Sequence, residues 1–240
     1  MQISFNKKNR TFRLDTENVS YAMMIGPSGE LRHLYYGAAL GKDDDVSGLA
    51  HRFDRAFSPN PEGLTPDTSL NIACLEYTAF GSGDFHNAAL ALRKENGTAV
   101  TSAVYKSHVI TKGKAPLPGL PASFAPEKEV QTLEITLADS FSGAEIVLRY
   151  SVFADSDVIA RSVKVVNPTK QTIRIEKLMS AELDFDSCSF DMLYLQGKWA
   201  RERHAFRTPL QPGMQGFRSA RGSTGHQYNP GVVFAEKSAA

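Results

Sequence analysis

The chain has 240 residues, 42% of them hydrophobic, and its 27 basic residues nearly balance 26 acidic ones. At roughly 150 residues per domain this length corresponds to one or two domains, and a single large all-β unit is common at this size. A formal net charge of +1 disfavours nucleic-acid binding. The first fifteen residues lack the apolar stretch of a signal peptide, and no window of about 18 apolar residues follows, so we expect a cytoplasmic protein.

Short alternating segments separated by turn residues predict strands along most of the chain. Residues 20–37 read as a hairpin around a Gly-Pro-Ser-Gly turn. Two segments rich in Gly and Pro, 41–67 and 112–128, predict long loops, and the apolar residues of the first favour an ordered one. The other expected strands are 3–5, 12–14, 68–75, one starting at Gly83, 90–93, 104–110, 132–137, 144–153, 158–166, 173–183 and 232–234.

No segment combines a cap, a 3.6-residue apolar period and a stop signal, so few or no helices are expected. Many short antiparallel strands with regularly spaced turns predict an all-β fold, a large β-sandwich. The sequence holds no GxSxG, HExxH or phosphate-binding glycine pattern, and its two cysteines have no zinc-ligand spacing. We therefore expect neither a metal nor a cofactor. A glycosidase needs two facing carboxylates, and composition cannot select a pair from 26 acidic residues.

A series of local strings resembles the N-terminal domain of bacterial α-galactosidases of glycoside hydrolase family 36. The matches follow one order over essentially the whole chain, and it is this common order that makes the resemblance specific. The strings are Ser20-Tyr21, 33–37 (HLYYG), 54–59 (DRAFSP), Asp84-Phe85, 105–108 (YKSH), 113–122 (GKAPLPGLPA), 132–135 (TLEI), 158–162 (VIARS), 197–203 (GKWARER) and 226–230 (HQYNP).

This resemblance implies a galactose-mutarotase-like antiparallel β-supersandwich over residues 1–240, placed before a catalytic (β/α)8 barrel. The family removes terminal α-linked galactose with retention, and its two catalytic aspartates lie in the barrel, beyond this chain. The chain would then be inactive alone and would serve as an accessory and oligomerisation domain. The implied partners are a galactoside, the protein's own barrel and sister subunits in a tetramer, with no membrane or nucleic acid.

The same resemblance implies two sugar-pocket residues, Asp54 and Trp199, which reach a neighbouring subunit's active site. A carboxylate accepts hydrogen bonds from sugar hydroxyls, and an indole covers the apolar face of a pyranose. The structural alternatives are pairing of Asp54 with Arg52 or Arg55 and ordinary core packing of Trp199. Arg55 is a possible supporting residue.

Three further residues are possible supports of the sugar pocket. Arg201 belongs either to an ion-pair ladder with Glu202 and Arg203 or to the residues that orient the Trp199 loop. His226 and Asn229 either fix a turn or contact the sugar.

The sequence also departs from the family pattern at three places. Pro66 lies where an Arg is usual, His86 replaces the Arg of an Asp-Phe-Arg string, and Gly225 replaces a Ser. The missing Arg leaves the sugar specificity open, and the change at His86 is expected to alter an internal salt bridge.

Two other functions stay open at this point. A stand-alone carbohydrate-binding module of sandwich fold would bind sugar without a barrel. A mutarotase-like sugar epimerase would use a His and a Glu in a groove, with His108, His226 and Glu202 as the candidates.

Overall fold

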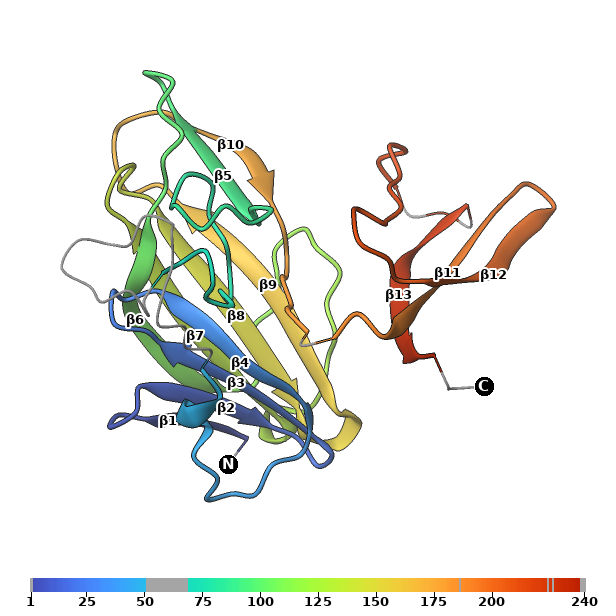
Figure 1. Cartoon of the computed structure of the whole chain (residues 1–240), viewed down its shortest axis with the longest axis horizontal. Coiled ribbons are helices and arrows are strands. Elements are labelled where there is room, and N and C mark those ends of the chain that lie inside the picture. Colours follow the sequence, from blue (N-terminus) through green and yellow to red (C-terminus); the bar gives the residue numbers. More distant parts are fainter. Residues whose placement is uncertain (1, 51–68, 186, 224, 226, 238–240) are drawn as a thin grey trace. The chain divides into compact units, whose positions relative to one another are not determined.

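The computed structural model describes residues 2–50, 69–185, 187–223, 225 and 227–237. The chain divides into two compact units, unit 1 (Met1–Asp184) and unit 2 (Phe185–Ala240). All pairs of named strands are antiparallel, which confirms the all-β prediction (Figure 1). The helical elements of the described residues are short 3-10 turns: η1 (Val46–Leu49), η3 (Glu127–Glu129) and η4 (Ala154–Ser156). None of the helices in this part of the chain is long and apolar enough to cross a membrane.

Unit 1 contains two four-stranded sheets, in which each strand pairs with the next one along the chain, and one two-stranded sheet, β10-β5. The first sheet consists of β1 (Ile3–Asn6), β2 (Thr11–Asp15), β3 (Val19–Ile25) and β4 (Leu31–Ala38). The second consists of β6 (Ala103–Lys112), β7 (Val130–Asp139), β8 (Glu145–Phe153) and β9 (Val158–Val166). The third pairs β5 (Leu90–Lys94) with β10 (Ile173–Leu178).

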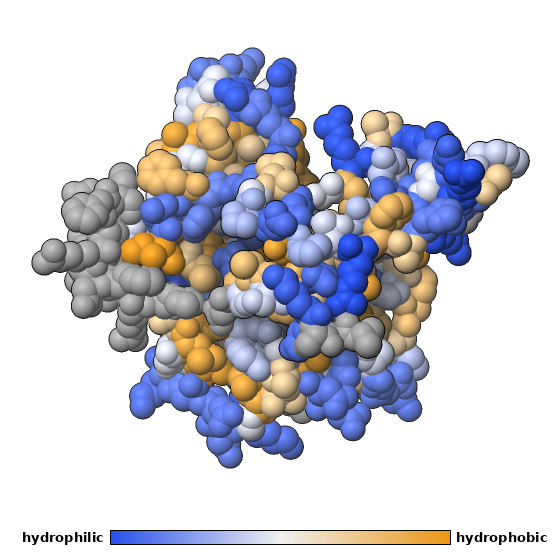
Figure 2. Space-filling view, turned by 45° about the vertical axis from the view of Figure 1, so that its right-hand side comes forward, coloured by the Kyte–Doolittle hydropathy of each residue, from blue (hydrophilic) through white to orange (hydrophobic). Residues whose placement is uncertain are grey.

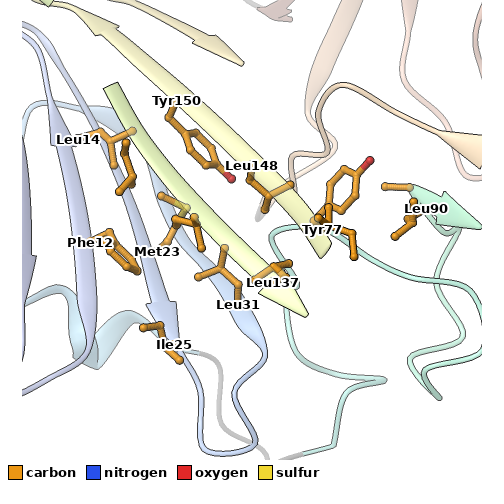
Figure 3. Packing of buried hydrophobic residues seen from close by; sticks show 14 of the residues in the cluster. Phe12, Leu14, Met23, Ile25, Leu31, Tyr77, Leu90, Leu137, Leu148 and Tyr150 are labelled. Atoms are coloured by element: carbon orange, nitrogen blue, oxygen red, sulfur yellow. The ribbon is translucent and has the colours of Figure 1, made fainter. Parts of the chain in front are cut away.

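The alternation of the sequence explains the core of unit 1. Buried and partly exposed residues alternate along β7 and β8, because successive side chains of a strand point to opposite faces. The buried side chains of β2 and β3, such as Phe12 and Met23, belong to the same cluster as Leu137 and Leu148 of the second sheet. Figure 3 shows these side chains lying between the two sheets. The four-stranded sheets therefore enclose one core.

Arg13 holds the start of the first long loop. Its guanidinium donates to the carbonyl of Gly41 at 2.7 Å and to those of its neighbours Leu40, Lys42 and Asp44 at 3.4 Å. Its side chain also pairs with Asp15 at 3.0 Å. The described part of this loop is therefore ordered, as the sequence predicted. The rest of it, residues 51–68, lies outside the described residues.

Two strand predictions are wrong, and a third strand is shorter than predicted. Ser69 to Ala73 form a turn in which the Ile72 and Ala73 N–H groups donate to the Ser69 carbonyl, and only Leu75 makes an isolated bridge. No strand begins at Gly83, since Gly83 and Phe85 have left-handed φ angles of 87° and 57° that break an extended chain. The strand expected over 173–183 ends at Leu178.

Unit 2 is a three-stranded antiparallel sheet in the order β12-β11-β13. Its strands are β11 (Phe190–Lys198), β12 (Arg201–Pro209) and β13 (Tyr228–Glu236). The middle strand β11 pairs along most of its length with both neighbours. Only Met192 and Asp191 of the three strands are buried, each 8% exposed, so this unit has a small core of its own. Figure 2 shows hydrophilic side chains mixed with apolar ones over its visible face.

Candidate functional site

The strands β11 and β12 form a hairpin (Figure 1). Trp199 follows the last residue of β11 and so lies at the tip of this hairpin. Lys198 pairs with Arg201 and closes the two-residue turn. The turn needs a left-handed backbone, which Ala200 adopts with φ 56°, and the Ala200 N–H donates to Glu202 Oε1 at 3.0 Å. The indole is 88% exposed, so the alternative of ordinary core packing is wrong for Trp199.

A β-bulge on β12 decides which side chains share a face with the middle strand. Gln196 pairs with His204, but Lys198, two residues further along β11, pairs with Arg201, three residues back along β12. The extra residue lies at Glu202 or Arg203, and Arg203 takes a left-handed φ of 59°. Because side chains alternate along a strand, the bulge turns Arg201 onto the face of His204.

Gly197 allows the two strands to approach at this bulge. A Cβ on residue 197 would lie 1.9 Å from the carbonyl oxygen of Arg201 and 2.9 Å from the Cα of Glu202. Only glycine fits so close to a neighbouring backbone. The glycine of the sequence string GKWARER is therefore what lets β12 bulge beside β11.

The edge strand β13 is irregular at the same level of the sheet. Tyr194 pairs with Val232 and Gln196 with Tyr228, so four residues of β13 match two of β11. Pro230 lies in this stretch, which an edge strand tolerates. Asn229 belongs to β13 and does not form the turn expected of it. The turn precedes it, where the Tyr228 N–H donates to the Gly225 carbonyl at 3.3 Å.

These irregular strands surround a hollow of about 460 Å³ on unit 2. Three strands provide its walls, and the segment before β13 adds one amide. The aromatic rings of Phe206 and Tyr228, which are 41% and 38% exposed, contribute its apolar surface. The residues around it are Gln196, Gly197, Lys198, Arg201, His204, Phe206, Gln227 and Tyr228. Of the sequence-predicted site residues, Arg201 lines this hollow and Trp199 lies between two of its lining residues in the chain.

The other predicted site residues are placed as follows. Asp54, Arg55 and His226 lie outside the described residues, as does Pro66. Glu202 accepts from the turn N–H of Ala200. No ion pair joins Arg201 to Glu202 within the described part of the chain. The expected ion-pair ladder is therefore wrong for these two residues.

His86 lies in the loop before β5. Its backbone N–H donates to Oδ1 of Asp84 at 3.3 Å. Asp84 is 3% exposed, and its Oδ2 has no hydrogen-bond partner among the described residues. This buried carboxylate therefore has no ionic partner among the described residues, and the expected change of a salt bridge at His86 stays a prediction.

Of the mutarotase-like candidates, His108 belongs to unit 1 and Glu202 to unit 2, and His226 lies outside the described residues. The His108 ring packs against Phe5 and Phe12 at 4.4 and 4.9 Å between centroids, and burial lowers its pKa. Its Nδ1 is 2.7 Å from the Tyr105 hydroxyl. This histidine serves as a packing residue of β6.

Sequence reasoning missed a buried charge cluster in unit 1. The Glu76 carboxylate is fully buried and pairs with Arg161 at 2.7 Å. The hydroxyls of Tyr21 and Tyr150 donate to it at 2.7 Å, and His33 Nδ1 lies at 3.2 Å. Burial opposes ionisation of Glu76, but the charge of Arg161 and the hydrogen bond from His33 prevail and lower its pKa.

Every oxygen of this carboxylate is satisfied by unit 1 itself, so the cluster reads as a structural crosslink. It joins β3, β4, β8 and β9 to the segment before β5. Its members are far apart in the sequence, and no local signal pointed to them. Among the described residues, no group of three His, Cys, Asp or Glu side chains is placed to hold a metal ion.

The chain belongs to the family of glycosyl hydrolase family 36 N-terminal domains, whose model matches residues 29–240. It is 43% identical over 239 residues to the bifunctional alpha-galactosidase/sucrose kinase AgaSK of Mediterraneibacter gnavus, covering 99% of this chain and 25% of that protein. The family 36 alpha-galactosidase AgaB of Geobacillus stearothermophilus superimposes with a TM-score of 0.92 at 38% identity, over 100% of this chain and 32% of AgaB.

A variant of the alpha-galactosidase AgaA from Geobacillus stearothermophilus, solved in complex with raffinose, matches with a TM-score of 0.89 and 39% identity over 95% of this chain and 32% of its own. The chain thus spans a quarter to a third of the length of these relatives. These likenesses confirm the family and the fold that the sequence strings suggested.

Proposed function

We propose that this chain is the N-terminal accessory and oligomerisation domain of an α-galactosidase. The whole protein would hydrolyse terminal α-linked galactose with retention, as a cytoplasmic homotetramer. Family membership and the partial coverage of α-galactosidase relatives support this proposal. Residues 1–240 would act as one domain built of both units. The catalytic aspartates would lie in a following barrel, so this chain alone is inactive.

Within the tetramer, Asp54 and Trp199 would complete the sugar pocket of a neighbouring subunit. The single observation that carries this proposal is the exposure of Trp199, which lies in the chain between Lys198 and Arg201, two residues that line the hollow. An aromatic ring that the domain does not bury can stack on the C–H face of a pyranose. Arg55, His226 and Asn229 are proposed as supports of the same pocket.

The test uses the enzyme made from the whole parent reading frame, with raffinose as substrate. Trp199→Ala is expected to raise KM several-fold, since stacking of this kind contributes about 0.5–1.5 kcal/mol. Trp199→Phe should restore part of the loss. Met214→Ala is the matched control, because Met214 is also exposed, at 90%, and belongs to unit 2. An unchanged KM in Trp199→Ala would refute the sugar contact, and a parent without a barrel would refute the accessory role.

A stand-alone carbohydrate-binding module is the second candidate, and the hollow within unit 2 favours it. Trp199 is the only tryptophan of the chain, so its fluorescence reports binding directly. Saturable raffinose binding by the 240-residue chain alone would support the module. Absence of a spectral change at any raffinose concentration would exclude it and leave the accessory domain.

A further inference from the structure

The hollow of unit 2 carries an unbalanced positive charge. Lys198 and Arg201 line it, and His204 and two glutamine amides add hydrogen-bonding groups. No carboxylate occurs among its described lining residues. The whole chain has a formal net charge of only +1, so this local excess does not follow from a basic composition.

These donors have no partner in the described part of the chain. The side chains of Lys198, Arg201 and His204 form no hydrogen bond or ion pair there. Arg207, on the same strand as Arg201, instead pairs with Asp191 at 2.6 Å. Unit 2 therefore pairs one arginine internally and leaves another one unpaired at the hollow.

The backbone is shaped to bring the unpaired groups together. Without the bulge, alternation along β12 would place Glu202 on the face of His204, and Arg201 would point to the opposite face. The bulge that brings Arg201 to this face requires a left-handed φ at Arg203, which costs free energy. The bulge thus substitutes a cation for a carboxylate at the hollow, next to Lys198.

The hollow also has an apolar side. Phe206 and Tyr228 present half-exposed rings to it, and the exposed Trp199 follows the lining residue Lys198 in the chain. Aromatic rings fit the C–H face of a sugar, whereas lysine and arginine recognise phosphate oxygens. A volume of about 460 Å³ is in the range of small-molecule sites.

We propose that this hollow binds a phosphorylated sugar, with the phosphate at Lys198 and Arg201 and the sugar ring at the aromatic side chains. An anionic group gains from both positive charges, a neutral ligand does not, and a metal ion would be repelled by them. The ring position rests on the sugar contact proposed above for Trp199, whereas the anion position does not depend on it.

The experiment titrates the 240-residue chain with galactose 6-phosphate, galactose and inorganic phosphate. Binding is followed by Trp199 fluorescence and by the amide shifts of β11 and β12. We expect galactose 6-phosphate to bind more tightly than either fragment, and added salt to weaken it. Arg201→Gln and Lys198→Gln should each lower its affinity about tenfold or more, since each removes a charged hydrogen-bond donor. Trp199→Ala should weaken galactose 6-phosphate and leave inorganic phosphate unaffected.

Arg218→Gln is the control. Arg218 is exposed, belongs to unit 2 and does not line the hollow, so it removes the same charge elsewhere. The proposal would be overturned if Arg201→Gln and Arg218→Gln lost equal affinity for galactose 6-phosphate, or if the chain did not bind galactose 6-phosphate. If phosphate binds at Arg201 while Trp199→Ala changes nothing, the anion site stands and the proposed sugar contact fails. If galactose alone binds as tightly as its phosphate, the anion site is refuted and the sugar contact stands.

Discussion

The two units use their charged side chains in opposite ways. In unit 1, Glu76 and Arg161 are buried together, and two tyrosine hydroxyls and a histidine complete their hydrogen bonds. In unit 2, Lys198 and Arg201 are exposed around a hollow and have no partner among the described residues. Satisfied buried charges hold strands in place, whereas unpaired exposed charges are available to a ligand. The comparison separates a structural unit from a candidate binding unit.

The largest expected effect tests the structural side of this comparison. Glu76→Gln leaves Arg161 buried without its counter-charge, which typically costs about 3–5 kcal/mol of unfolding free energy. Urea denaturation of both proteins measures the difference. Glu176→Gln is the control, because the Arg93–Glu176 pair is exposed and its loss should not be measurable. A similar small change in both variants would show that the buried cluster does not stabilise unit 1.

This stabilisation should also depend on pH. The pKa of Glu76 in the folded chain lies below its ordinary value of 4.5, because Arg161 and His33 outweigh the effect of burial. A carboxylate with a lowered pKa stabilises the fold above its unfolded pKa, and the stabilisation is lost as the pH falls through the folded pKa. The gap between wild type and Glu76→Gln should therefore be full at neutral pH and begin to narrow as the pH falls below the ordinary glutamate pKa of about 4.3. A constant gap down to pH 2 would contradict this origin.

An intermediate effect is expected from the bulge of unit 2. Gly197→Ala forces β12 away, since the new Cβ would meet the Arg201 carbonyl at 1.9 Å, and such overpacking costs about 1–3 kcal/mol. Hydrogen exchange should show faster opening of the amides of β11 and β12 with no change in unit 1. The Gly197→Ala substitution should also weaken the binding of galactose 6-phosphate. Gly231→Ala on β13 is the matched control, because nothing lies within 4 Å of its Cβ position. Equal exchange in the two variants would remove the role assigned to Gly197.

The sequence predicted what depends on local periodicity. Alternation along β7 and β8 and the turn around residues 26–29 correspond to the observed strands and hairpin. No strand starts at Gly83 because a non-glycine residue, Phe85, takes a left-handed φ. A phenylalanine gives no indication of such a backbone in the sequence. A single such residue ends an extended segment, so strand boundaries were less predictable than strand existence.

The candidate site was predictable only in part for a similar reason. The family strings predicted Trp199 and Arg201 as site residues. Lys198, His204 and Tyr228 line the hollow because of the pairing between strands, which the strings do not show. The bulge that changes the face of Arg201 depends on where β12 meets Gly197. No pattern within one strand contains that information.

The smallest expected effect concerns the turn that presents Trp199. Ala200 has a left-handed φ of 56°, which costs a residue with a Cβ roughly 1 kcal/mol and costs glycine nothing. Ala200→Gly relieves this strain, but the greater freedom of the unfolded chain offsets part of the gain in stability. The free energy of unfolding should therefore rise by about a few tenths of a kcal/mol. Ala205→Gly, in the regular part of β12, should instead lower stability, because there glycine only adds freedom to the unfolded chain. Thermal unfolding resolves the opposite signs. Destabilisation by both substitutions would mean that the turn around Trp199 is not strained, and the hairpin tip would then be an ordinary connection.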